Sequence, residues 1–259
     1  MNGTMADAVI YEQPLHELTR VCLRLEQLFF QLDHYLKDET HFGTRSVITA
    51  IINILHLLDR PDLKAKLAKE LSHQISALLQ LEDTPEIDKE KLNVILHQLN
   101  DLVRCFIDSS GKIGQPLREL ELLNNLRLHL ASAGGGCSFD IPVYHYWLAQ
   151  PFQTRQETIK SWLEEFSKIR LAIDLLLKLT REGARIQSKT AEHGFYQELL
   201  DPQANLRLVR VAVPNNIAAY PEVSVGRHFL SVRFYNPTIH ERPTQSAQDI
   251  AFGISYCNV

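Results

Sequence analysis

The sequence predicts an α+β protein, with a large N-terminal helical domain followed by a small, mainly antiparallel β domain. From about Leu15 to Glu182, apolar residues recur at three- and four-residue steps, which is the period of an amphipathic helix. After about Gly183, prolines become frequent and short runs alternate apolar with polar residues, as half-buried strands do. We therefore expect a helical domain over residues 1–183 and a β domain over residues 184–259.

The helical part divides into successive apolar stripes. They cover Leu18–Leu32, Arg45–Leu58, Leu63–Leu78, Leu92–Phe106, Leu117–Leu130 and Ile159–Leu177. The second stripe is apolar almost all round, so we expect its helix at the centre of the domain. Pro61 suits the first position of the third helix, and Thr84-Pro85-Glu86 is a start signal for the fourth. Thr154-Arg155-Gln156-Glu157 has the pattern of a capping box that opens the last helix.

Three runs in the C-terminal part have strand character. They cover Leu206–Val213, His228–Phe234 and Ile250–Tyr256. Alternation of large apolar with polar residues in these runs predicts a sheet with one buried and one solvated face. We expect three or four short strands in one small sheet.

Bulk composition limits the classes of function. The net charge is −4 at pH 7, which argues against broad adhesion to nucleic acid, because such binding needs a basic face. No apolar run approaches the roughly 20 residues of a membrane span, so we expect no membrane insertion. Met1 to Ile10 does not have the pattern of a secretory signal, and we expect a cytoplasmic protein.

Residues that could carry chemistry show no catalytic or metal-binding spacing. The cysteines Cys22, Cys105, Cys137 and Cys257 are scattered, and the histidines form no paired set, so we expect free thiols, no metal and no cofactor. Gly134-Gly135-Gly136 lacks the lysine of a phosphate loop and predicts a tight turn before an extended segment. Pro142 then suits the start of a short helix. Burial is the favoured interpretation of Cys137, and a turn acceptor that of Asp140.

Arginines offer the clearest candidate binding surface. Arg227 and Arg233 are six residues apart in a strand-like run, so their side chains are expected on the same face of the sheet, with Phe229 and Ser231 between them. Arg207 is on the polar side of a neighbouring strand candidate. Guanidinium groups bind carboxylates through two parallel hydrogen bonds, so such a face could dock an acidic peptide. An ordinary solvated sheet face is the alternative.

Four segments, in order along the chain, carry a family resemblance. They are Tyr11-Glu12-Gln13-Pro14-Leu15 with Arg24-Leu25-Glu26, then Ile113 to Glu119 (IGQPLRE), then Gly134 to Leu148 (GGGCSFDIPVYHYWL), and His193 to Gln197 (HGFYQ). This set is similar to the landmarks of the ZapD family, the Z-ring-associated proteins of bacterial cell division.

The resemblance implies a non-enzymatic cytoplasmic homodimer that acts at midcell on the division ring. Family members bind the C-terminal tail of the tubulin-like protein FtsZ and crosslink its protofilaments, so the helical domain is expected to dimerise and the β domain to bind the partner. Residues that match the family's basic binding pattern are Arg24, Arg118 and His145, and more loosely Arg227 and Arg233. Glu121 stands where the resemblance leads us to expect a further arginine, so Arg118 is expected to contribute less here.

Two alternatives stay open. The first is a helical adaptor that docks another protein, which predicts exposed Leu and Phe side chains on helices. The second is an enzyme with a site around Asp140, Tyr144 and His145, which predicts a deep polar pocket with strongly shifted ionisable groups.

Overall fold

A computed structural model describes residues 7–81, 87–201 and 203–258. The chain forms two compact units. One is helical and spans Val21–Leu177, and the other combines the described parts of Met1–Arg20 and Lys178–Val259. The α+β class is confirmed: helices fill the first part of the chain and antiparallel sheets the last.

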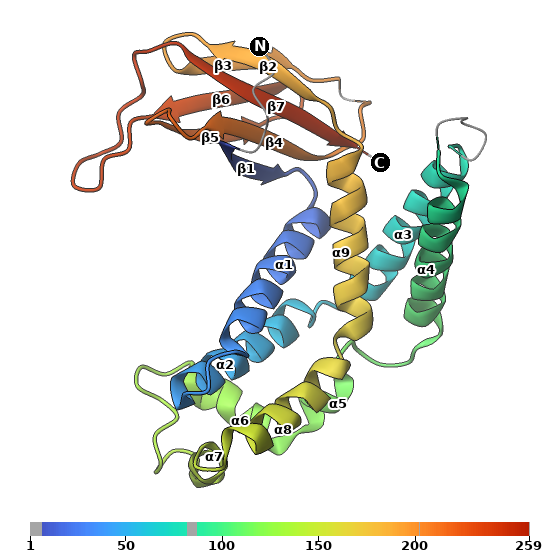
Figure 1. Cartoon of the computed structure of the whole chain (residues 1–259), viewed down its shortest axis with the longest axis vertical. Helices are drawn as coiled ribbons and strands as arrows, with labels where there is room; N and C mark the ends of the chain where they lie inside the picture. The colour runs from blue at the N-terminus through green and yellow to red at the C-terminus, as the bar shows by residue number, and fades with distance from the viewer. Residues whose placement is uncertain (1–6, 82–86, 202, 259) are drawn as a thin grey trace. The chain divides into compact units, whose positions relative to one another are not determined.

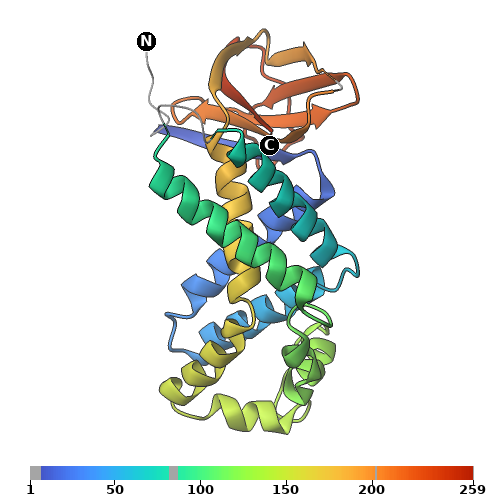
Figure 2. The same ribbon diagram turned by 90° about the vertical axis from the view of Figure 1, so that its right-hand side faces the viewer.

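The helical unit is built from amphipathic helices around an aliphatic core. Its elements are most of α1 (Glu17–Tyr35) and α9 (Ser167–Glu182) with α2 (His41–Leu57), α3 (Leu63–Leu79), α4 (Lys89–Asp108), α5 (Gln115–Glu119), α6 (Glu121–Leu130), α7 (Pro142–Leu148) and α8 (Phe152–Glu164). Ile48, Ile51 and Ile54 of α2 are fully buried, which confirms the central position expected for this helix. Helices α3 and α4 pack side by side as a hairpin (Figures 1 and 2).

Several helix boundaries differ from the sequence prediction. Leu120 has extended backbone angles, so the expected helix over Leu117–Leu130 is two helices, α5 and α6. The last stripe is also divided, because Glu165 and Phe166 donate to carbonyls only three residues back and start a new direction. Phe166 nevertheless stays buried, so the apolar periodicity continues across the break and conceals it.

The start signals were only partly correct. The capping box at Thr154 was wrong, since α8 begins at Phe152 directly after Pro151. Pro61 is not the first residue of α3, because this helix begins two residues later, at Leu63. Asp88 caps α4 by accepting from the backbone N–H groups of Glu90 and Lys91. The expected start at Thr84-Pro85-Glu86 lies outside the described residues.

The described strands of the β unit form two antiparallel sheets, one more than expected. Its strands are β1 (Ala8–Pro14), β2 (Ile186–Ala191), β3 (Phe195–Leu199), β4 (Leu206–Pro214), β5 (Tyr220–Val225), β6 (Phe229–Tyr235) and β7 (Ile250–Asn258). The sheet orders are β1-β4-β7-β2 and β3-β6-β5. Both sheets contribute to one apolar core, with Val211 and Ile254 from the first and Val232 and Phe234 from the second. The unit is therefore a sandwich of two sheets.

Strand β1 changes the domain boundary. It pairs antiparallel with β4 along its whole length, from Ala8 opposite Pro214 to Pro14 opposite Leu208. The sequence interpretation placed all of residues 1–183 in the helical domain, whereas the structure places β1 and the end of α9 in the β unit. The bidentate contact of Arg181 with Glu12, at 2.9 and 2.7 Å, ties the end of α9 to this strand.

The glycine-rich segment forms a compact turn. Gly134 and Gly136 have positive φ angles of 73° and 86°, as the expected tight turn requires. The segment that follows was expected to be extended, but Asp140 and Ile141 both donate to the Cys137 carbonyl, so it is a turn as well. Helix α7 then begins at Pro142, as predicted.

Candidate functional site

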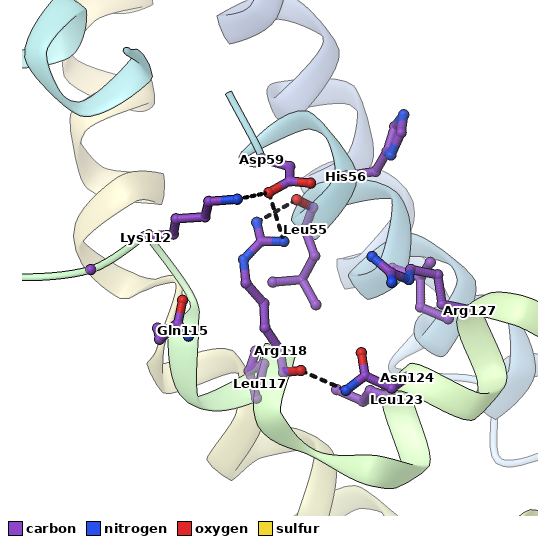
Figure 3. Close-up of a pocket in the computed structure, with 12 residues that line it drawn as sticks. Leu55, His56, Asp59, Lys112, Gln115, Leu117, Arg118, Leu123, Asn124 and Arg127 are labelled. Atoms are coloured by element: carbon purple, nitrogen blue, oxygen red, sulfur yellow. Dashed lines mark hydrogen bonds and ion pairs between the residues drawn. The ribbon is translucent and has the colours of Figure 1, made fainter. Parts of the chain in front are cut away.

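A cleft of about 590 Å³ opens in the helical unit beside α2, α5 and α6. Its apolar walls come from Ile52, Leu55, Leu117 and Leu123. Polar and charged side chains complete it: His56, Asp59, Lys112, Gln115, Arg118, Asn124 and Arg127 (Figure 3). An apolar surface bordered by a few charged groups is the usual composition of a ligand site.

Local backbone geometry brings α5 against α2. Gly114 has a φ of 69°, and a Cβ atom there would lie 2.8 Å from Leu55 Cδ2, so both the turn and the close approach require glycine. Pro116 lies in the first turn of α5, where its missing N–H costs nothing. Lys64 of α3 donates to the carbonyl oxygens of Ser109 and Gly111 and holds the preceding loop in place.

Arg118 on α5 points inward and holds this helix against α2. Its Nη2 donates to the carbonyl oxygen of Leu55 at 2.6 Å, so it satisfies one of the last carbonyls of α2. Its Nη1 lies 3.5 Å from Asp59 Oδ1, and only 13% of the side chain is exposed. Burial lowers the pKa of this guanidinium, and the Asp59 carboxylate partly offsets that effect.

Asp59 is the carboxylate of the cleft. Lys112 Nζ donates to its Oδ1 at 2.5 Å, and Figure 3 shows Lys112 and Arg118 converging on this carboxylate. The hydrogen bond from Lys112, followed by the charge of Arg118, holds the pKa of Asp59 below its ordinary value. The expectation that Glu121 would compensate Arg118 receives no support, because Glu121 is exposed in the first turn of α6 and is not among the residues lining the cleft.

The cleft is cationic overall. Lys112, Arg118 and Arg127 line it against a single carboxylate, Asp59. Arg127 was not predicted from the sequence. A signal was present in the sequence, because Leu123 and Asn124 lie four and three residues before Arg127 and so share one face of a helix with it. All three residues line the cleft.

The other residues expected in the helical half do not line this cleft. Arg24 is exposed on α1, and His145 is exposed on α7. Among the described residues, the structure therefore assembles Arg118 with Asp59, Lys112 and Arg127 rather than with Arg24 or His145.

Arg233 occupies the solvated face of the second sheet, as predicted. Leu230, Val232 and Phe234 point into the core, and Arg233 is exposed between them. Its cross-strand neighbours are Phe195 on β3 and Glu222 on β5.

The guanidinium of Arg233 lies 5.3 Å from the centre of the Phe195 ring, and Tyr220 and Tyr235 stack at 5.9 Å on the same sheet. This face combines a cation with aromatic rings, which suits a peptide with acidic and apolar side chains.

The strand position predicted for Arg227 was wrong. Arg227 lies in the bend between β5 and β6, because β6 begins only at Phe229. It is exposed and lines a separate pocket of about 370 Å³ in the β unit, together with Arg20 and Asp201. Arg207 lies on β4, where its Nη1 is 3.0 Å from His16 Nδ1.

The segment around Asp140, Tyr144 and His145, which the enzyme alternative named as a site, stabilises the glycine-rich turn. Asp140 Oδ2 accepts from the backbone N–H groups of Gly136 and Cys137, so its predicted role as a turn acceptor is confirmed. Tyr144 is buried, which raises the pKa of its hydroxyl, while His145 is exposed. These three side chains do not converge on one of the pockets described above.

The cysteines are free thiols in different environments. Burial of Cys137 was a wrong prediction, since this residue is exposed. Burial raises the pKa of Cys22 to about 12 and that of Cys257 to about 11, so these two thiols are weak nucleophiles. Within the three described stretches, no group of three or more His, Cys, Asp or Glu side chains could hold a metal ion.

Exposed apolar side chains are also present on the helical unit, as the adaptor alternative expects. Phe42 on α2 is 81% exposed and Leu128 on α6 is 67% exposed. In the described part of the chain, none of the helices combines the length and the apolar character needed to cross a bilayer.

Helices followed by a two-sheet sandwich, with a cationic cleft on the helical unit, define an α+β protein whose surface suits an anionic group. Residues 23–233 match the family model ZapD, described as a cell division protein. The chain belongs to the ZapD family. This membership supports a role in cell division, and the family is not a known enzyme family.

Similar proteins carry the name "Cell division protein ZapD" and match over nearly their full length. The one from Coxiella burnetii is 36% identical over 257 residues, which cover 98% of this chain and 100% of the relative. The one from Methylococcus capsulatus is 35% identical over 253 residues, covering 98% and 99%. The one from Azoarcus sp. is 33% identical over 251 residues, covering 97% and 100%.

Proposed function

We propose that this protein binds the C-terminal tail of FtsZ and crosslinks FtsZ protofilaments, which stabilises the Z ring at midcell in the cytoplasm. The observation that carries the proposal is the cationic cleft, which is lined by Lys112, Arg118 and Arg127, by a single carboxylate and by apolar side chains. Such a cleft suits a peptide that presents a carboxylate beside an apolar side chain. The solvated face of the second sheet around Arg233, Phe195 and Glu222, here called the Arg233 face, offers a second surface that combines a cation with apolar rings.

Bundling follows from weak contacts that are repeated. A flexible tail loses conformational freedom when it binds, so one tail on one site gives a weak complex. Two sites on a dimer, and many tails along a filament, raise the effective concentration and convert weak binding into firm crosslinking. Crosslinking needs binding surfaces and no catalytic group, which agrees with a family of cell division proteins.

The test is sedimentation of FtsZ polymers with and without this protein. We expect GTP-assembled FtsZ to pellet at low speed, as bundles do, only when the protein is present. FtsZ without its C-terminal tail serves as the control, because it should polymerise and yet stay in the supernatant at low speed. A wild-type protein that leaves both forms of FtsZ unbundled would refute the proposal.

We also predict a stable homodimer formed mainly by the helical unit, since a crosslinker needs two copies of each site. The sequence suggested the apolar segments Arg45–Leu58 and Ile159–Leu179 as the dimer surface, but most of their apolar side chains are buried in the core of the unit. The motivation that remains is the exposed apolar side chains of the helical unit, such as Phe42 and Leu128, which are 81% and 67% exposed. Sedimentation equilibrium should give twice the chain mass of 29.7 kDa. A monomer at tens of micromolar, a rough threshold for a functional dimer, would contradict this.

A further inference from the structure

We propose that Arg127 is the residue that directly contacts a carboxylate of the bound peptide, and that Arg118 is a positioning residue. This inference rests on the proposed function and assigns the roles within the cleft. Both arginines line the same cleft, but their surroundings differ, and the difference separates a side chain that holds the fold from one that is available to a ligand.

Each nitrogen of the Arg118 guanidinium already has a partner inside the protein. Nη2 donates to the Leu55 carbonyl, Nε lies 3.5 Å from the Ile113 carbonyl, and Nη1 faces Asp59. A peptide carboxylate that approached Arg118 would compete with Asp59 and with these carbonyl oxygens. Displacing them would leave a carbonyl of α2 without a donor, which costs free energy. Arg118 therefore serves to hold α5 against α2.

Lys112 is engaged in the same way. Its ammonium group donates to Asp59 at 2.5 Å, so the one carboxylate of the cleft is shared between Lys112 and Arg118. These three groups form a compact cluster with a net charge of +1. Figure 3 shows them grouped at one side of the cleft, with Arg127 on α6 at the other.

Arg127 is the cation that remains available. It is exposed, it lines the cleft, and within the described part of the chain its side chain makes no hydrogen bond or ion pair. The orientation of α6 is fixed beside it, because Asn124 Nδ2 donates to the Arg118 carbonyl at 2.6 Å. An incoming carboxylate therefore meets a guanidinium whose donors are free and whose helix is already in place, so little ordering is needed on binding.

The apolar walls give this contact its specificity for a peptide. Ile52, Leu55, Leu117 and Leu123 line the cleft that Arg127 borders. A carboxylate can pair with the planar fork of Arg127 through two parallel hydrogen bonds while a neighbouring apolar side chain enters the cleft. The assigned ligand is thus an acidic group next to an apolar one on an extended peptide.

The experiment measures binding of a labelled FtsZ tail peptide to the full-length protein by fluorescence anisotropy across a salt series. Arg127→Gln removes the charge and keeps a polar side chain of similar shape. Arg104→Gln is the matched control, because Arg104 is an exposed arginine of the same unit on α4, outside the cleft. Arg118→Gln tests the positioning role. Urea unfolding of each variant separates effects on binding from effects on folding.

We expect Arg127→Gln to raise the Kd roughly tenfold or more, the effect of losing a charge-assisted hydrogen bond. Its unfolding curve should not change, and the dependence of log Kd on log salt should become shallower. Arg104→Gln should bind as the wild type does. Arg118→Gln should lower the urea midpoint and should weaken the salt dependence less than Arg127→Gln does, because the guanidinium of Arg118 is largely buried beside Asp59. A tail peptide with its acidic side chains replaced by amides should bind wild type and Arg127→Gln equally.

Two outcomes overturn the inference in distinguishable ways. If the wild type binds the peptide and Arg127→Gln binds it equally well, the role assigned to Arg127 is wrong while the proposed function stands. If the wild type does not bind the peptide, and also fails to bundle filaments, the proposed function fails and the inference fails with it.

Discussion

Replacing Arg233 with glutamate is expected to abolish bundling of FtsZ filaments while the fold and the dimer are retained. Arg233 is exposed on β6, where its side chain covers the Phe195 ring rather than an internal partner. Reversal of its charge would place two carboxylates opposite each other, because Glu222 is its cross-strand neighbour. The resulting face would repel an acidic tail. Arg227→Glu is expected to act in the same direction, since Arg227 is exposed in the adjoining bend.

Low-speed pelleting of FtsZ across a salt series is the measurement for these variants, with Arg104→Glu on α4 as the charge-matched control. Contacts between exposed charges are screened over about 8 Å at physiological ionic strength, so wild-type bundling should weaken steeply as salt rises. The stability of the fold should change less over the same range. Circular dichroism and sedimentation equilibrium verify folding and dimerisation. Pelleting that stays at the wild-type level for both variants would exclude the Arg233 face and leave the cleft of the helical unit as the binding surface.

Local periodicity was sufficient to predict most helices and the change to strands. The apolar stripe of α2 correctly placed Ile48, Ile51 and Ile54 in the core, and alternation correctly placed Leu230 and Val232 inside the sandwich. Periodicity failed where the chain turns without glycine or proline. Leu120 and Glu165 interrupt helices whose apolar spacing continues, and such a break depends on packing against distant residues.

Long-range pairing explains the remaining errors. Strand β1 contains Val9, Ile10 and Tyr11, which favour strands, but its burial does not alternate along the strand. Its partner β4 follows about 200 residues later, so the local pattern of Ala8–Pro14 did not show that this segment belongs to the β unit. Arg118 was named from the family resemblance alone. It lines the cationic cleft, but its inward orientation depends on Leu55 of α2 and on Asp59 just after that helix. The bend that holds Arg227 lies at the edge of a predicted strand, where element boundaries are least certain.

Replacing Gly135 with alanine is expected to cause the largest loss of stability of any substitution considered for this protein. A Cβ atom on Gly135 would lie 1.8 Å from the backbone oxygen of His129 and 2.8 Å from its carbonyl carbon. Both atoms belong to α6, so no flexible side chain can move aside. The Gly135 carbonyl also accepts from Arg45 Nη2 at 2.6 Å, and a shift of the turn would break this contact between the turn and α2.

The neighbouring glycine provides a matched control for this variant. Gly134 has a positive φ of 73°, but nothing lies within 4 Å of an added Cβ, so Gly134→Ala introduces only backbone strain of about 1–2 kcal/mol. Gly135→Ala adds a backbone collision and should lower the free energy of unfolding by about 3 kcal/mol or more. Urea unfolding followed by the helical circular dichroism signal compares the two variants in the full-length chain. Equal losses of unfolding free energy in the two variants would mean that α6 can move away from the turn. Arg127 lies on α6, so its side chain would then lack the fixed position that its binding role requires.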